Sequence, residues 1–169
     1  MGHLAIVALA LLPKHRPIRA RILNGQHVWP GRIVIGGAGH NHVARGIAHA
    51  GILRVFEQHG IEIHCIAGVS AGAIVAAAYA SGTTPDEIRS MGCSMRFGDV
   101  ARWTISRMGL VGSERMGGFL MRLLKCWRFE DMRIPLAIVA TDVGSTTPII
   151  FKEQGDVLLP VRASCSYPG

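Results

Sequence analysis

The stretch IEIHCIAGVSAGAIVAAAYA, residues 61–80, joins an apolar run to an alanine-rich run through Gly68-Val69-Ser70-Ala71-Gly72, a G-x-S-x-G pentapeptide. This order predicts a strand over residues 61–67, a sharp turn at the serine and a helix from residue 71. In such a turn the serine backbone is strained, and glycines flank it because a Cβ there would strike the neighbouring strand or helix. Ser70 is therefore the candidate nucleophile, with Gly68 and Gly72 permitting the turn. The alternative is a Gly/Ser turn that matches the pattern by chance.

Strand and helix patterns alternate around this stretch. Apolar runs at 32–35, 135–141 and 148–151 predict strands, and the apolar spacing over 43–58 predicts a helix. Thr84, Pro85 and Glu87 supply an N-cap, a first-turn proline and a capping-box acid, which predict the start of another helix. Short helices are expected within 89–133, most clearly over 114–125. Because strands that alternate with helices pair in parallel, we expect an α/β fold with a mainly parallel sheet covered on both faces.

Composition is typical of one globular domain. The chain has 169 residues, of which 49% are hydrophobic and 17% are charged, enough for a sizeable core. Pro30 and Gly31 break the pattern before the first predicted strand, so we expect a basic, partly disordered leader over 1–31 and the folded domain over 32–169. The four cysteines form no C-x-x-C pair, which argues against a disulfide framework or zinc site and favours a cytoplasmic location.

The positive charge is concentrated at the start of the chain. Seven basic residues precede Glu57, the first acidic residue, and the later charges cancel, so the net charge of +7 belongs to the first third. This asymmetry suits a membrane surface, a nucleic acid or a solvated leader, and the lack of interleaved aromatic residues argues against nucleic acid. The apolar run at 4–12 is too short to span a bilayer, which takes about 20 residues. Its basic residues follow it, unlike those of a signal peptide, and an interfacial anchor stays open.

A glycine-rich loop, Gly36-Gly37-Ala38-Gly39, follows the first predicted strand. Bare backbone at a helix N-terminus presents several N–H groups to an anion, so the loop is either a phosphate site or an oxyanion hole. The serine turn one βα unit later favours an oxyanion hole with donors from Gly37, Ala38 and Gly39, because acyl transfer needs donors where negative charge develops.

At this point the chain resembles the patatin-like phospholipase family. The matching pieces are four ordered segments, namely the loop 36–39 with Ala44-Arg45-Gly46, IAHAGIL at 47–53, GVSAG at 68–72 and RASCSYPG at 162–169. The resemblance covers about 32–169. It implies a three-layer α/β/α domain that hydrolyses acyl esters of lipids with a serine and an aspartate, without histidine; we expect no cofactor. Within the first segment, Arg45 and Gly46 belong to the motif, with Arg45 either bracing the glycine loop or lying on a helix surface.

The histidine positions support this reading. All eight histidines precede Ser70, whereas the α/β-hydrolase triad runs serine, acid, histidine. His40 and His42 could suggest a metal site, but two ligands without a nearby third are typical of polar loop residues, and we expect no metal.

Two features depart from the family pattern. Residues 40–43 separate the glycine loop from Ala44-Arg45-Gly46, which leaves the position of the oxyanion donors open. The family's catalytic aspartate lies in an Asp-Gly-Gly or Asp-Gly-Ala motif downstream of the Arg-Ala-Ser segment, and no such motif occurs up to Gly169. We therefore expect a C-terminally truncated member whose base lies beyond residue 169. Asp142 follows a predicted strand and is the alternative base, although the family has a structural turn there.

Three functions remain. The first is a serine acyl hydrolase acting on a lipid or other acyl ester, and the second is an inactive patatin-like fragment. The third is a nucleotide-binding α/β module, which the absence of G-x-G-x-x-G spacing disfavours. Membrane-surface contact is compatible with residues 89–133, which are rich in arginine and include Trp103, Trp127 and several methionines. The alternative is that these large apolar side chains belong to the core.

Overall fold

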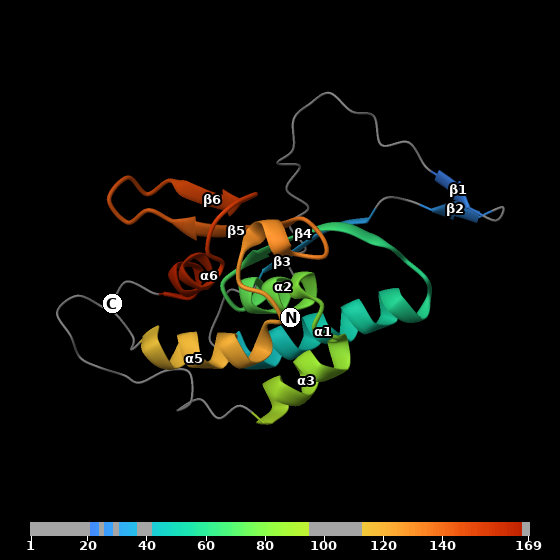
Figure 1. The fold of residues 1–169 in the computed structure, drawn as a ribbon, viewed down its shortest axis with the longest axis horizontal. Helices are drawn as coiled ribbons and strands as arrows, with labels where there is room; N and C mark the ends of the chain where they lie inside the picture. Colours follow the sequence, from blue (N-terminus) through green and yellow to red (C-terminus); the bar gives the residue numbers. More distant parts are fainter. Residues whose placement is uncertain (1–20, 24–25, 29–30, 37–41, 95–112, 167–169) are drawn as a thin grey trace, which may run out of the picture.

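The computed structural model describes residues 21–23, 26–28, 31–36, 42–94 and 113–166, with side chains described over 48–94 and 116–166. Two small sheets are present in this part of the chain. A hairpin of β1 (Arg21–Leu23) and β2 (Gln26–Val28) lies apart from the other elements (Figure 1). Most of the predicted leader, residues 1–20, lies outside the described residues, so the leader assignment remains a prediction.

The main sheet has four strands in the order β3-β4-β5-β6. Its members are β3 (Gly31–Gly36), β4 (Ile63–Val69), β5 (Leu136–Thr141) and β6 (Pro148–Lys152). The β3–β4 and β4–β5 pairs are parallel, and the β5–β6 pair is antiparallel. The predicted α/β class with a mainly parallel sheet is therefore confirmed, with one antiparallel strand at its edge.

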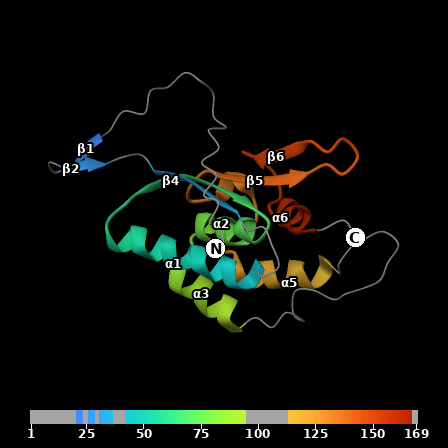
Figure 2. The ribbon, with the colours of Figure 1, turned by 180° about the vertical axis from the view of Figure 1, so that it is seen from behind.

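Helices connect the strands. They are α1 (His42–Gln58), α2 (Ala71–Ser81), α3 (Pro85–Ser94), α5 (Ser113–Leu123), the short 3₁₀ helix η1 (Phe129–Asp131) and α6 (Leu158–Cys165). Helix α2 contacts β3, β4 and β5, while α6 contacts β5 and α2. In both views the described helices gather on one side of the sheet (Figures 1 and 2). A helical layer on the other face, which the three-layer expectation includes, is not among the described residues.

The core includes residues of the sheet and of several helices. Its largest fully buried side chains are those of Leu53, Leu120, Ile138, Val157 and Val161. Helix α2 is buried on almost all sides, and its alanines allow α1 and the sheet to approach it closely. Its burial fixes the position of its N-terminus, which follows Ser70.

Helix α3 begins as predicted. The Thr84 N–H donates to Glu87 Oε2 at 2.7 Å, and the Glu87 N–H donates to Thr84 Oγ1 at 3.3 Å, which is a reciprocal capping box. Lys125, just after α5, donates to Glu87 Oε2 at 3.0 Å. The capping box therefore also joins the start of α3 to the end of α5.

Candidate active site

Ser70 occupies the single residue between β4 and α2. Its φ of 55° and ψ of −128° place it in a region that L-residues rarely adopt. This is the strained strand–turn–helix geometry that the G-x-S-x-G pattern predicts for a nucleophile. Ser70 as a residue is partly exposed to solvent.

Gly68 shows why the turn requires glycine. A Cβ on Gly68 would lie 2.5 Å from Ala73 Cα and 2.7 Å from the Gly72 carbonyl oxygen. The contact is with helix backbone, which cannot rotate away as a side chain can. Both Gly68 and Gly72 are buried, at the end of β4 and in the first turn of α2 respectively.

Both backbone polar atoms of Ser70 are hydrogen-bonded. The Ser70 N–H donates to Ser164 Oγ at 2.8 Å, and the Ser164 hydroxyl donates to the Val139 carbonyl of β5 at 2.6 Å. The Ser70 carbonyl accepts from the Ala73 N–H at 2.8 Å and from the Cys165 thiol at 3.2 Å. Burial raises the pKa of Cys165 to about 12, so this group is a neutral thiol that keeps its proton for the contact.

No sequence pattern predicted a role for Ser164 or Cys165. They lie in the Arg-Ala-Ser segment at the end of α6, one of the four segments that carry the family resemblance. That segment was the available signal, but its contact with Ser70 joins residues 94 and 95 positions apart and no local pattern predicts it.

The glycine loop begins beside this turn. Gly36, the last residue of β3, pairs with Val69, the last residue of β4. Gly37, Ala38 and Gly39 lie outside the described residues, as does His40. Arg45 and Gly46 lie near the start of α1, where only the backbone is described.

Asp142 lies at the same edge of the sheet, directly after β5. Its Oδ1 accepts from the Gly144 N–H at 2.9 Å and its Oδ2 from the Ser145 hydroxyl at 2.8 Å. The Ser145 hydrogen bond, followed by that from Gly144, holds the pKa of the Asp142 carboxyl below its usual value. Both oxygens therefore stabilise the turn between β5 and β6, and a lowered pKa makes a weaker base.

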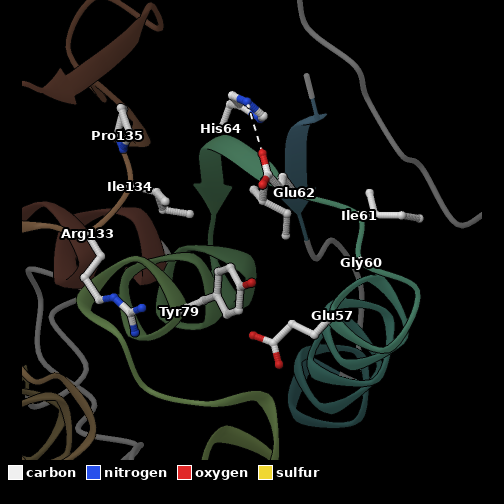
Figure 3. A pocket seen from close by; sticks show the side chains of 10 residues that line it. Glu57, Gly60, Ile61, Glu62, His64, Tyr79, Arg133, Ile134 and Pro135 are labelled. Carbon is white, nitrogen blue, oxygen red and sulfur yellow. Dashed lines mark ion pairs between the residues drawn. The ribbon is translucent and has the colours of Figure 1, made fainter. Parts of the chain in front are cut away.

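A hollow of about 590 Å³ opens at the opposite edge of the sheet, lined by Glu57, Gly60, Ile61, Glu62, Ile63, His64, Tyr79, Arg133, Ile134 and Pro135. Figure 3 shows Glu57, Tyr79 and Arg133 along one side, with the ion pair of Glu62 and His64 across from them. Burial, with a smaller contribution from Glu57, raises the pKa of Tyr79 to about 12. Ser70 is not part of this hollow, because the length of β4 separates them.

Two further observations concern the described residues alone. No three of their His, Cys, Asp and Glu side chains come together in a way that could hold a metal ion. None of their helices combines the length and apolar character needed to cross a bilayer.

Comparisons with known proteins place these features in a family. The family described as patatin-like phospholipase matches residues 34–169. A patatin-like phospholipase domain-containing protein of Caenorhabditis elegans is 34% identical over 160 residues, which cover 89% of this chain and 14% of that protein. The lysophospholipase NTE1 of Eremothecium gossypii is 49% identical over 61 residues, covering 36% of this chain and 4% of that protein. The chain thus spans a small part of these two relatives.

The fold also has a counterpart among solved structures. A chain in the crystal structure of SpcU in complex with ExoU, from the type III secretion system of Pseudomonas aeruginosa, superposes with a TM-score of 0.55. The match covers 82% of this chain and 38% of that one, at 15% identity. At that identity the similarity concerns the fold.

Proposed function

Because this chain belongs to the patatin-like phospholipase family, a family of lipid acyl hydrolases, we propose that Ser70 is the nucleophile of a serine acyl hydrolase. The observation that carries the proposal is the backbone of Ser70, a non-glycine residue at φ 55° between a strand and a buried helix. Such strain persists only where the surrounding structure over-determines it, and it is concentrated at functional sites.

In the proposed reaction, Ser70 Oγ attacks the carbonyl carbon of an acyl ester while a base removes its proton. The resulting tetrahedral intermediate expels the alcohol, which takes the proton back from the base. Water, deprotonated by the same base, then attacks the acyl-serine and releases the acid, and the serine regains its proton. The family resemblance implies that this base is an aspartate of an Asp-Gly-Gly or Asp-Gly-Ala motif, which in the family follows the Arg-Ala-Ser segment. Asp142 is a poor alternative because its carboxylate is held by its own turn.

The oxyanion donors are the N–H groups of Gly37, Ala38 and Gly39. This assignment is supported by Gly36, which begins the loop next to the end of β4. The Ser70 N–H is unavailable because it donates to Ser164. Loss of one oxyanion donor typically lowers kcat by about 10²- to 10³-fold.

The substrate is a lipid acyl ester, a class supported by the name of the lysophospholipase relative. We further propose that residues 32–169 form part of the catalytic domain and that the basic leader, residues 1–31, contacts an anionic membrane surface in the cytoplasm. The leader supports this contact because it carries four basic residues and no acidic one; the basic residues are Lys14, Arg16, Arg19 and Arg21.

The test uses the whole protein that contains these 169 residues. We expect it to hydrolyse 4-nitrophenyl butyrate and to react with a fluorophosphonate at Ser70, as located by peptide mass spectrometry. The variant Ser70→Ala should lose both properties, whereas Ser90→Ala, at an exposed serine of α3, should keep them. Undiminished turnover in Ser70→Ala, or labelling at another serine, would refute the assignment.

A further inference from the structure

The backbone hydrogen bonding between β4 and β5 ends at the pair Val69–Val139, and beyond it the Ser164 side chain bridges the two chains. Val69 and Val139 are the last paired residues of these parallel strands. The next N–H of the β4 chain is that of Ser70, and in a continued ladder it would bond directly to β5. Instead it donates to Ser164 Oγ at 2.8 Å, and that hydroxyl donates to the Val139 carbonyl at 2.6 Å. The hydroxyl is therefore inserted between the two backbone groups.

The two hydrogen bonds determine the orientation of the Ser164 hydroxyl group. A serine hydroxyl has one donor hydrogen, and here that hydrogen is directed to the Val139 carbonyl. A lone pair then faces the Ser70 N–H. Because the Ser164 hydroxyl lies between the two backbone groups, the chain can leave β5 after Val69 and enter the turn while the partly buried Ser70 N–H keeps a hydrogen-bond partner.

The neighbouring residue of α6 contacts the next peptide unit, on the other side of the Ser70 Cα. The Cys165 thiol donates to the Ser70 carbonyl at 3.2 Å, so two consecutive residues of one helix hold the amide and the carbonyl of Ser70. Ser70 keeps a positive φ in spite of its side chain, which requires such external contacts.

We propose that Ser164 is a positioning residue for the nucleophile: it fixes the Ser70 backbone, and through it the direction of the Ser70 hydroxyl. The proposal rests on the proposed function of Ser70. It predicts that loss of the Ser164 hydroxyl slows attack by Ser70 without weakening substrate binding, because Ser164 bonds to main chain and not to substrate. A displacement of about 1 Å at a reacting atom can lower the rate by about 10²-fold.

The experiment compares three variants of the whole protein. It measures the second-order rate constant for fluorophosphonate labelling of Ser70, together with kcat and KM for 4-nitrophenyl butyrate. We expect Ser164→Ala to lower the labelling rate and kcat by about 10- to 100-fold with KM little changed. Ser164→Thr, which keeps the hydroxyl, should recover most of the rate. The matched control is Ser166→Ala, since the exposed Ser166 hydroxyl donates to the Arg162 carbonyl of its own helix at 2.9 Å.

The outcomes separate this proposal from the proposed function. If the unaltered protein is not labelled at Ser70, both fail. If it is labelled and Ser164→Ala is labelled as fast, or if Ser166→Ala slows labelling equally, only the positioning role fails. Circular dichroism checks the folding of each variant. Should Ser164→Ala not fold, Ser164→Cys replaces it, because its thiol keeps the size but bonds weakly; labelling of Ser164→Cys at the unaltered rate would overturn the role.

Discussion

Gly68 in β4 lies against Ala73 in α2, so closely that a Cβ on Gly68 would stand 2.5 Å from the Ala73 Cα. The contact brings the end of the strand and the first turn of the helix together. Ser70 lies between these two residues in the chain, so the close approach determines how sharply the chain must turn there. The glycine is thus required by packing and not by its own backbone angles.

The first prediction concerns this contact. Gly68→Ala should lower the free energy of unfolding by about 3 kcal/mol or more, because the clash is with backbone and either β4 or α2 must shift. Urea denaturation followed by circular dichroism measures the change. As a control, Gly51→Ala in α1 places its Cβ where no atom lies within 4 Å, and it should raise stability by up to about 1 kcal/mol. Equal effects of the two substitutions would contradict the packing argument.

Much of the elbow was predictable from the sequence. The sequence of residues 61–80 predicted β4, the turn at Ser70 and α2. The signals for these elements are local: an apolar run, two glycines spaced around the serine, and a run rich in alanine. The antiparallel direction of β6 was implicit in the sequence as well, since the six residues between β5 and β6 are too few for a parallel crossover.

Helix α6 was not predicted. It has eight residues, it contains Pro160, and its apolar pattern is short. Pro160 is tolerated because it lies in the first turn, where its missing N–H would have no helical partner. The contact of α6 with Ser70 depends on tertiary structure, which no local pattern encodes.

The second prediction concerns acid stability. The Thr84 N–H, followed by Lys125 and the Thr84 hydroxyl, lowers the pKa of Glu87 from 4.5 to about 2. A carboxyl whose pKa is lower in the folded state stabilises the fold above its unfolded pKa, and this contribution is lost as pH falls. The thermal midpoint of the unaltered protein should therefore decrease between about pH 4.5 and pH 2 more steeply than that of Glu87→Gln.

The capping box offers a matched pair for this test. Thr84→Ala removes the hydroxyl that accepts from the Glu87 N–H and should cost about 1 kcal/mol of stability, whereas Thr84→Ser keeps it. Parallel pH profiles for the unaltered protein and Glu87→Gln would show that the carboxylate does not contribute as described.

The third prediction separates Asp142 from the catalytic base. Asp142→Asn retains an oxygen that can accept from the Gly144 N–H, so the turn should persist and kcat should stay near that of the unaltered protein. Loss of a true general base would lower kcat by about 10²- to 10⁴-fold. The measurement is kcat for 4-nitrophenyl butyrate at several pH values. A decrease of that size in folded Asp142→Asn would transfer the role of base to Asp142.

The last prediction measures the strain at Ser70 apart from catalysis. Ser70→Ala and Ser70→Gly both remove the hydroxyl, so both variants should be inactive. Glycine can adopt φ 55° with ψ −128° without strain, whereas alanine cannot. Relief of strain in the glycine variant outweighs its greater freedom when unfolded, so Ser70→Gly should be more stable than Ser70→Ala by about 1 kcal/mol. Urea midpoints of the two variants provide the comparison. If Ser70→Ala is the more stable variant, the backbone at residue 70 is not strained. Strain then no longer supports the proposal that Ser70 is the nucleophile.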